Sequence, residues 1–247
     1  MKIIISPAKK LNDKKNNLQN TSNIQFLNET KYLIKELQKY SLIEIKKMMN
    51  ISDKLALLNY ERFQNWDLNS SDVMPAILLF KGDVYKGLKA DSFSNEQLNF
   101  AQDHLRIISG LYGLLRPLDL VFPYRLEMGT NIQTNKADNL YEFWNDKLRL
   151  NLISEMKDND ILINLASNEY SKAVELDQFK QKVITPVFKD SKNGRLKVIS
   201  FYAKRARGEM VNYIVRNNIK DLSDVRSFNY GGYTFVSEEN NEILFAR

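Results

Sequence analysis

The sequence predicts one compact domain of the α/β class, with mixed α and β elements. Short runs of β-branched and aromatic residues, typical of strands, are interspersed with segments of helical apolar periodicity. The chain has 247 residues, 43% of them hydrophobic, which is enough for one sizeable core. It contains no linker, internal repeat or low-complexity block, so we expect residues 1–247 to form a single domain.

The first half of the chain is predicted to open with a buried strand and then to become largely helical. The run KIIIS at 2–6 has the pattern of a buried strand, and the polar segment at 9–23 that of a loop. Helical periodicity extends over 25–66. The apolar run AILLF at 76–80 is expected to be a strand that leads into the glycine loop KGDVYKGL, a common place for a functional site.

A further helix is predicted over residues 94–109. Ser94, with Gln97 three positions later, is a capping-box signature. Gly110 follows where a helix needs its C-terminal glycine. One face of this helix would carry Leu98, Ala101, Leu105 and Ile108.

The second half of the chain is predicted to be richer in strands. Apolar residues at every fourth position indicate a long helix over 139–157, and another helix is expected over about 205–219. Asn193-Gly194 is a dipeptide typical of a tight hairpin turn. The expected strands are DILINLAS (160–167), KVITPVF (182–188), LKVISFYA (196–203) and EILFAR (242–247).

The composition excludes several kinds of site. The absence of cysteine rules out disulfides and thiolate chemistry, and the single histidine, His104, argues against zinc sites and Ser-His catalysis. We therefore predict no metal and no cofactor. Lys and Arg number 36 against 30 acidic residues, and the formal charge of +6 favours an anionic partner. No apolar run is long enough to cross a bilayer or to serve as a signal peptide, so we expect a cytoplasmic protein.

The stretch SGLYGLLRPLDLVFPYRLEMG, residues 109–129, concentrates glycine, proline, tyrosine and arginine. A helix ending in Gly110, a short turn and a second segment around Pro117 resemble a helix-hairpin-helix, in which backbone N–H groups contact a DNA phosphate. Gly110 and Gly113 are three positions apart, whereas the usual hairpin has glycines two apart. A purely structural turn is therefore an open alternative.

Basic residues gather at two further places. Lys204, Arg205 and Arg207 lie at the expected junction of a strand and a helix, which suits phosphate recognition. A solvated basic turn is the alternative. Arg125 and Glu127, if extended, would share one face and form either an ion pair or part of a site.

Polar groups near three expected strand ends are candidate catalytic residues. The serine and lysine in ISPAKK, three positions apart, resemble a Ser-Lys nucleophilic pair. The segment FKGDVYKGL matches neither a Walker loop nor a dinucleotide fingerprint, which disfavours those nucleotide-binding classes. A capped strand end with an exposed lysine is the alternative for the pair in ISPAKK, and helix caps are the alternative for the polar groups of NLASNEY. The candidates are Ser6, Lys9, Lys81, Asp83, Tyr85, Asn164 and Tyr170.

Several blocks together resemble the bacterial YaaA family of peroxide stress resistance proteins. They follow the family's order over nearly the whole chain: ISPAK, ISDKLA, FKGDVYKGL, LRIISGLYGLLRPLDLVFPYRLEMG, NLASNEY, ISFYAKRARG and FNYGGY. The resemblance implies a cytosolic protein of the oxidative stress response that limits iron-associated damage. It also implies a single domain of unusual topology, with a basic cleft and a helix-hairpin-helix-like element that binds DNA.

The resemblance also implies positions for DNA contacts, but no catalytic residue. Its implied partner is DNA, in duplex form and with little base reading; no membrane and no obligate protein partner are implied. The hairpin element maps to Ser109, Gly110, Leu111, Tyr112, Gly113 and Leu114. Candidates for the basic cleft are Arg116, Arg125, Lys204, Arg205 and Arg207.

Three functions are thus in competition. The first is a DNA-binding protection protein. The second is an enzyme that acts on a nucleobase or nucleotide through the strand-end lysines, serine and carboxylate. The third and weakest is an iron-binding protein, which would have to rely almost wholly on oxygen ligands. Convergence of Ser6, Lys9, Lys81 and Lys204 in one pocket would favour the enzyme, and their dispersal would remove its motivation.

Overall fold

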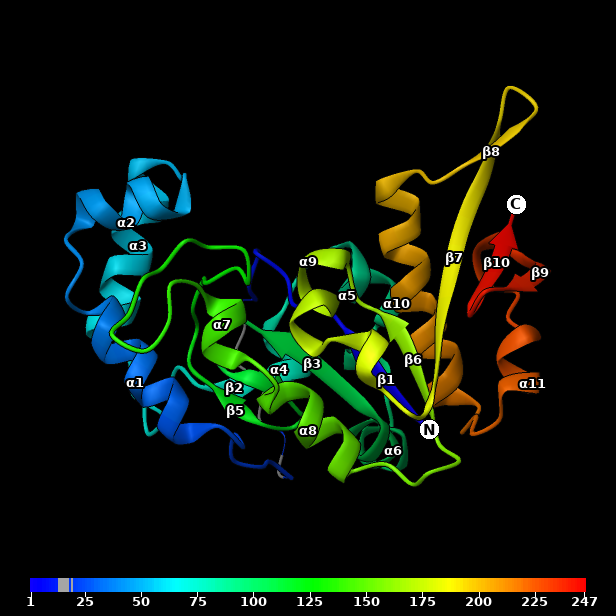
Figure 1. Ribbon diagram of the computed structural model, residues 1–247, viewed down its shortest axis with the longest axis horizontal. Coiled ribbons are helices and arrows are strands. Elements are labelled where there is room, and N and C mark those ends of the chain that lie inside the picture. The colour runs from blue at the N-terminus through cyan, green and yellow to red at the C-terminus, as the bar shows by residue number, and fades with distance from the viewer. Residues whose placement is uncertain (13–17, 19) are drawn as a thin grey trace.

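The computed structural model describes residues 1–12, 18 and 20–247 and shows one mixed α/β domain built on a largely parallel sheet (Figure 1). The strand order is β4-β3-β1-β6-β7-β10-β9, with β8 paired to β7. The strands are β1 (Lys2–Ile5), β3 (Leu105–Ser109), β4 (Gly113–Leu115), β6 (Ile161–Leu165), β7 (Lys182–Lys192), β8 (Arg195–Lys197), β9 (Thr234–Glu239) and β10 (Glu242–Ala246).

The centre of the sheet is parallel and buried on both faces. β1 pairs in parallel with β3 on one side and with β6 on the other, and the parallel pairing continues through β7 to β10. All four residues of β1 and all five of β3 are buried. Continuous apolar runs of this kind are what a parallel strand covered on both sides requires.

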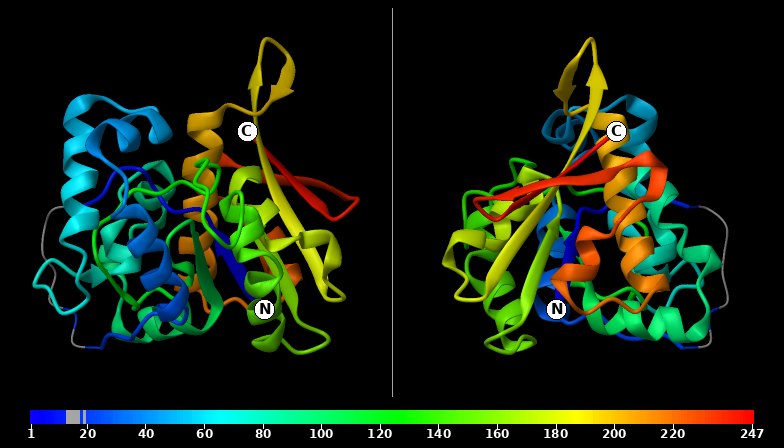
Figure 2. Two further views of the ribbon diagram at one scale, coloured as in Figure 1. Left: turned by 60° about the vertical axis from the view of Figure 1, so that its left-hand side comes forward. Right: turned by 90° about the vertical axis from the view of Figure 1, so that its right-hand side faces the viewer.

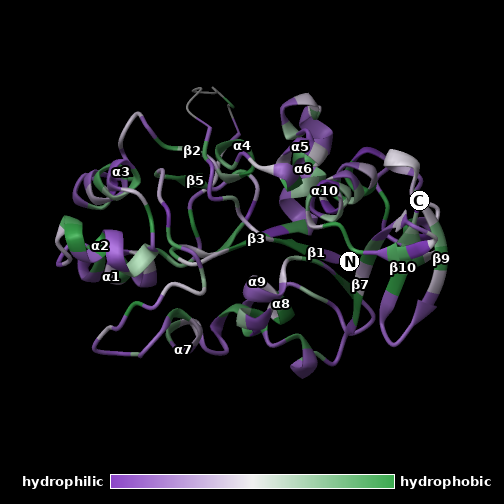
Figure 3. Ribbon diagram, turned by 90° about the horizontal axis from the view of Figure 1, so that it is seen from above, coloured by the Kyte–Doolittle hydropathy of each residue, from purple (hydrophilic) through white to green (hydrophobic). Residues whose placement is uncertain are grey.

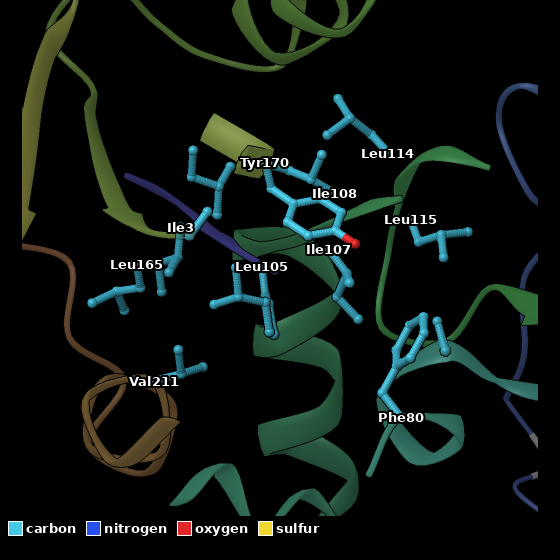
Figure 4. Packing of buried hydrophobic residues seen from close by; sticks show 14 of the residues in the cluster. Ile3, Phe80, Leu105, Ile107, Ile108, Leu114, Leu115, Leu165, Tyr170 and Val211 are labelled. Atoms are coloured by element: carbon cyan, nitrogen blue, oxygen red, sulfur yellow. The ribbon is translucent and has the colours of Figure 1, made fainter. Parts of the chain in front are cut away.

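Helices cover both faces of the sheet. Seen from above, α5 (Asp83–Leu88), α6 (Asn95–His104) and α10 (Ser200–Arg216) lie on one face (Figure 3). The other face carries α7 (Leu140–Trp144), α8 (Lys147–Ser154) and α9 (Asn168–Ser171). The same layering is visible in the core, where Tyr170 on α9 and Val211 on α10 lie on opposite sides of the sheet (Figure 4).

The remaining elements lie at the two ends of the sheet. One end carries α1 (Leu27–Leu37), α2 (Leu42–Met49), α3 (Asp53–Gln64), α4 (Ala76–Leu79) and the short pair β2 (Met74–Pro75) and β5 (Leu120–Val121). The other carries α11 (Leu222–Arg226) beside β9 and β10. No helix in the described part of the chain is long and apolar enough to span a membrane.

Several sequence predictions are confirmed. The runs at 2–6, 160–167 and 242–247 contain β1, β6 and β10, and the helical region at 25–66 contains α1 to α3. Ser94 and Gln97 form the predicted capping box. Asn193 and Gly194 turn the β7–β8 hairpin with φ angles of 55° and 70°. The predicted loop at 9–23 lies partly outside the described residues.

Two element predictions in the first half are wrong. The run at 76–80 contains the helical turn α4, not a strand. All four residues of α4 are buried, and a short buried apolar run has no periodicity that distinguishes a helix from a strand. The helix predicted over 94–109 ends at His104, and Leu105–Ser109 is strand β3. The spacing of Leu105 and Ile108 fits a helix, but both are wholly buried in the parallel sheet.

Two predictions in the second half also need correction. The strand predicted over 196–203 stops at Lys197, and α10 begins at Ser200, because the buried stripe of Ala203, Ala206 and Met210 has the period of a helix. The three basic residues of the KRARG segment therefore lie within a helix rather than at a junction. The helix predicted over 139–157 is two helices, broken at Asn145, whose φ of 44° is left-handed.

Residues 109–114 do not have the helix-hairpin-helix geometry that the sequence suggested. The segment is the turn of the β3–β4 hairpin, and each of its residues is buried. A Cβ on Gly110 would lie 2.5 Å from the Leu126 carbonyl oxygen, and one on Gly113 would meet the Trp144 ring at 2.8 Å. The glycines thus allow close packing in the core, and their backbone is not available to a phosphate.

Candidate functional site

A cavity of about 320 Å³ opens where β1 and β6 end, between the loops that follow these strands and the helices α5 and α10. The carboxyl ends of neighbouring parallel strands are a common place for ligand sites in α/β folds. We call it the strand-end cavity. Its polar lining consists of Ser6, Lys9, Lys10, Lys81, Asp83, Tyr85, Ser167, Glu169, Tyr170, Lys204 and Arg207.

The crossing of α5 and α10 brings distant parts of the chain to this cavity. A Cβ on Gly87 would collide with the Arg205 carbonyl oxygen, and one on Gly208 with the Val84 carbonyl oxygen. The two helices therefore contact each other backbone to backbone, which only glycine permits. Lys204 and Arg207, three positions apart on α10, consequently face the same cavity as Lys81.

Positive charge dominates the cavity. Its lining has five basic side chains against two acidic ones, Asp83 and Glu169. Within the part of the chain that the structure describes, the side chains of Lys81, Lys204 and Arg207 have no hydrogen bond or ion pair. Burial lowers the pKa of the Arg207 guanidinium, as expected for a desolvated cation. The cavity thus has cationic groups free to bind an anion.

Three of the other charged lining groups have partners. Lys9 forms an ion pair with Glu127, and the Asp83 carboxylate lies 3.3 Å from Lys86 Nζ. The Glu169 carboxylate accepts a hydrogen bond of 3.0 Å from the Gly129 amide and keeps its charge. The unpaired cations of the lining still outnumber this one carboxylate, so the excess of positive charge stays in place.

The innermost polar groups are two serines held close together. The Ser167 amide donates to Ser6 Oγ at 2.9 Å, and the two hydroxyl oxygens are 3.2 Å apart. The Tyr85 hydroxyl donates to the Ser6 carbonyl oxygen at 3.1 Å. Burial raises the pKa values of Tyr85 and Tyr170, so both phenols stay neutral and can donate hydrogen bonds.

The structure brings most of the predicted catalytic candidates together, but not Asn164. That side chain is buried within the sheet, where it donates to Thr185 Oγ1 at 3.2 Å and accepts from the Ala166 amide at 3.1 Å. The other candidates that line the cavity are Ser6, Lys9, Lys81, Asp83, Tyr85 and Tyr170. Ser167 and Glu169, from the NLASNEY block at the end of β6, also line the cavity, as does Lys10, which the sequence did not single out.

Three of the predicted arginines are engaged elsewhere. Arg116 forms an ion pair of 2.9 Å with the buried carboxylate of Asp119. Arg205 pairs with Glu209 one helical turn along α10, at 2.9 Å. Arg125 pairs with Glu127 at 3.0 Å and lines a small recess beside the strand-end cavity.

A second cavity has no connection with the predicted residues. It has a volume of about 370 Å³ and lies against α3, lined in part by Leu58, Glu61 and Arg62. Among the described residues, no three acidic or histidine side chains form a group that could hold a metal ion. The strand-end cavity is therefore the place where sequence candidates and geometry coincide.

Comparison with known proteins agrees with the sequence resemblance. The family model described as "Peroxide stress protein YaaA" matches residues 1–239. A UPF0246 protein of Saccharophagus degradans is 46% identical over 254 residues, which cover 100% of this chain and 99% of that protein. UPF0246 proteins of two Aliivibrio fischeri strains are 46% and 45% identical over 255 residues, covering 100% of this chain and 98% of each. The chain belongs to the peroxide stress protein YaaA family.

Proposed function

We propose that this protein binds duplex DNA in the cytoplasm as part of the peroxide stress response. The observation that carries the proposal is the cationic lining of the strand-end cavity, with Lys81, Lys204 and Arg207 unpaired among the described residues. The family description supports the link to peroxide stress. Phosphate contacts give affinity with little base reading, so we expect binding to many sequences.

The β7–β8 hairpin is a second element suited to DNA. It projects beyond the body of the protein, on the same side as the first turn of α10 (Figures 1 and 2). Lys192, Arg195 and Lys197 are exposed on it, and a two-stranded ribbon fits the major groove of DNA. In this proposal the hairpin takes the role that the sequence assigned to residues 109–114.

Binding of this kind would limit iron-associated damage indirectly. Iron ions, like other cations, are attracted to the phosphate backbone of DNA. A protein that occupies those phosphates with its own lysines and arginines would compete with iron there. No metal ligand on the protein is needed for this effect.

The salt dependence of duplex affinity tests the proposal. The double variant Lys81→Ala/Lys204→Ala should weaken binding and reduce the slope of log affinity against log salt by about 1.8, at about 0.9 per phosphate contact. The matched control is Lys157→Ala/Lys180→Ala, which removes the same charge from the residues that precede β6 and β7, at the opposite edge of the sheet. Equal slopes in the two double variants would refute the proposed site, as measured by fluorescence anisotropy.

A second candidate function is an enzyme acting on a nucleotide or nucleobase. The convergence of Ser6, Lys9, Lys81 and Lys204 on one cavity favours it. An unprotonated lysine amine could attack the C1′ carbon of a deoxyribose as the glycosidic C1′–N bond breaks, so that the base leaves with that electron pair and takes up a proton from water. A carboxylate such as Asp83 could accept the proton that the attacking amine loses. Borohydride trapping of a lysine adduct on DNA with damaged bases tests this candidate. Absence of both adduct and turnover over a panel of lesions would count against it.

A further inference from the structure

The lining of the strand-end cavity is of two kinds. Its apolar surface comes from Pro7, Ala8, Val84 and Leu165 with the ring of Tyr85. Its polar groups include the unpaired cations and the serine hydroxyls. A ligand that uses both kinds of lining combines a flat or apolar group with an anionic one.

We propose that the strand-end cavity binds a single nucleotide unit, with its phosphate against Arg207, Lys81 and Lys204 and its base against the apolar lining residues. The nucleotide is either free in solution or rotated out of a bound duplex. In the second case the inference rests on the proposed function, DNA binding, and deepens it. Both forms present the same base, sugar and phosphate.

The proposed phosphate contacts are centred on Arg207. Its guanidinium is partly buried and has no carboxylate partner among the described residues, and its planar fork of N–H donors is suited to two phosphate oxygens. Lys81, in the loop before α5, and Lys204, on α10, are more exposed and reach the same cavity. The Ser6 and Ser167 hydroxyls supply neutral donors in the interior.

The cavity is limited in size, and its apolar lining is already positioned. A volume of about 320 Å³ lies near the lower end of the range for small-molecule pockets, which favours one nucleotide unit over a longer segment. The hydrogen bond from Tyr85 to the Ser6 carbonyl fixes the ring that forms one wall. Leu165 at the end of β6 is 1% exposed, so the floor belongs to the core of the domain.

Calorimetric titration tests the site directly. The probes are dAMP, dCMP, dGMP and dTMP, with the four nucleosides and inorganic phosphate as partial ligands. At least one monophosphate should bind more tightly than both its nucleoside and phosphate alone. Arg207→Gln should weaken that binding about tenfold or more, because a charged hydrogen-bond partner is lost. If inorganic phosphate binds as tightly as every monophosphate, the apolar lining does not contribute to binding and the inference is wrong.

A matched arginine on the same helix controls for net charge. Arg205→Gln removes one positive charge two positions away, from a side chain that pairs with Glu209 and does not line the cavity. Its effect on monophosphate affinity should stay within about twofold. Arg207→Lys keeps the charge but loses the fork, and an intermediate loss of affinity is expected. Equal losses in Arg205→Gln and Arg207→Gln would overturn the assignment.

A duplex containing 2-aminopurine distinguishes the two sources of the nucleotide. Its fluorescence rises when the base leaves the helical stack, while anisotropy in the same sample reports duplex binding. A rise that depends on Arg207 supports an extruded nucleotide; monophosphate binding without a rise supports a free one. Duplex binding with neither signal refutes the inference and leaves the proposed function intact. Monophosphate binding without duplex binding refutes the proposed function and leaves the inference intact.

Discussion

The central sheet has one edge where β1 begins and an opposite edge where β1 ends. Both edges carry clustered charges, but those at the first edge are paired, whereas cations at the second are unpaired among the described residues. At the edge where β1 begins, Glu155 lies 2.9 Å from Lys2 Nζ and 2.5 Å from the Arg106 guanidinium. At the edge where β1 ends, Lys204 and Arg207 have no such partner in the described part of the chain. Charges paired within the fold hold it together, whereas unpaired charges are available to a ligand.

The paired charges at the edge where β1 begins are also deeply buried. The side chains of Lys2, Arg106 and Glu155, which we call the Glu155 cluster, are only 11%, 4% and 17% exposed. Lys2 also donates to the Asp103 carbonyl, and Arg106 to the carbonyl of Leu105, at 2.7 Å each. Loss of one member would leave the others desolvated without compensation. Lys204 is exposed at the rim of the strand-end cavity and carries no comparable penalty, whereas Arg207 is partly buried there and burial lowers its pKa.

Replacement of Glu155 by Gln should have the largest effect on stability. It leaves Lys2 and Arg106 buried without a counter-charge, and we expect a loss of about 3 kcal/mol in the free energy of unfolding. Urea denaturation followed by circular dichroism measures it. Glu239→Gln, at an exposed position on β9, should change stability by less than about 0.5 kcal/mol.

The corresponding change at the other edge is Lys204→Gln. It should leave the urea midpoint almost unchanged while weakening duplex binding, because the side chain has no intramolecular partner among the described residues. Loss of stability similar to that of Glu155→Gln would break the distinction between the two edges.

At the edge where β1 ends, stability depends on the close packing of α5 against α10 and not on charge. Gly208→Ala tests this. The added methyl group would collide with the Val84 carbonyl, so α5 must move away from α10 at a cost of about 2 kcal/mol. Gly129→Ala is the control, because its Cβ would meet only the Glu169 side chain at 3.4 Å. We expect Gly208→Ala also to weaken ligand binding, since Lys81 and Lys204 would separate. A variant with unchanged stability and affinity would show that the close crossing has no role.

The sequence predicted the cavity residues that come directly after a single apolar run. Ser6 and Lys9 are predictable because polar residues follow the apolar run of β1, and Tyr85 because it lies in the glycine segment KGDVYKGL. The meeting of Lys81 with Lys204 depends on the helix crossing at Gly87 and Gly208. That crossing is set by tertiary packing, and no local pattern encodes it.

The glycine-rich stretch at 109–129 shows the limit of such patterns most clearly. Glycine marks a backbone with special geometry, but the sequence does not say whether that geometry faces solvent or core. Here the Tyr112 hydroxyl accepts from Trp66 Nε1 at 3.0 Å and donates to the Phe122 carbonyl at 2.9 Å, deep inside the domain. The three-residue spacing of Gly110 and Gly113 belongs to a β-hairpin, which explains its mismatch with the helical motif.

The smallest expected effect is a difference in acid sensitivity between the two edges. Burial lowers the pKa of His104, which lies beside Lys2 and donates through Nδ1 to the Met1 carbonyl at 2.7 Å. Burial alone would raise the pKa of Glu155, but Arg106 and Lys2 together lower it. In both cases the unfolded chain binds protons more readily than the folded one, so stability falls as the pH falls.

The pH profile of the urea midpoint separates the two contributions. The His104 contribution should be complete above about pH 6.5 and decline below it, and that of Glu155 should be lost below about pH 4.5, as the pH passes through its lowered value. His104→Gln should flatten the first decline and Glu155→Gln the second. Lys204→Gln changes charge at the other edge and should keep both, because lysine does not titrate in this range. Identical profiles in all three variants would mean that the acid response does not originate at the edge where β1 begins.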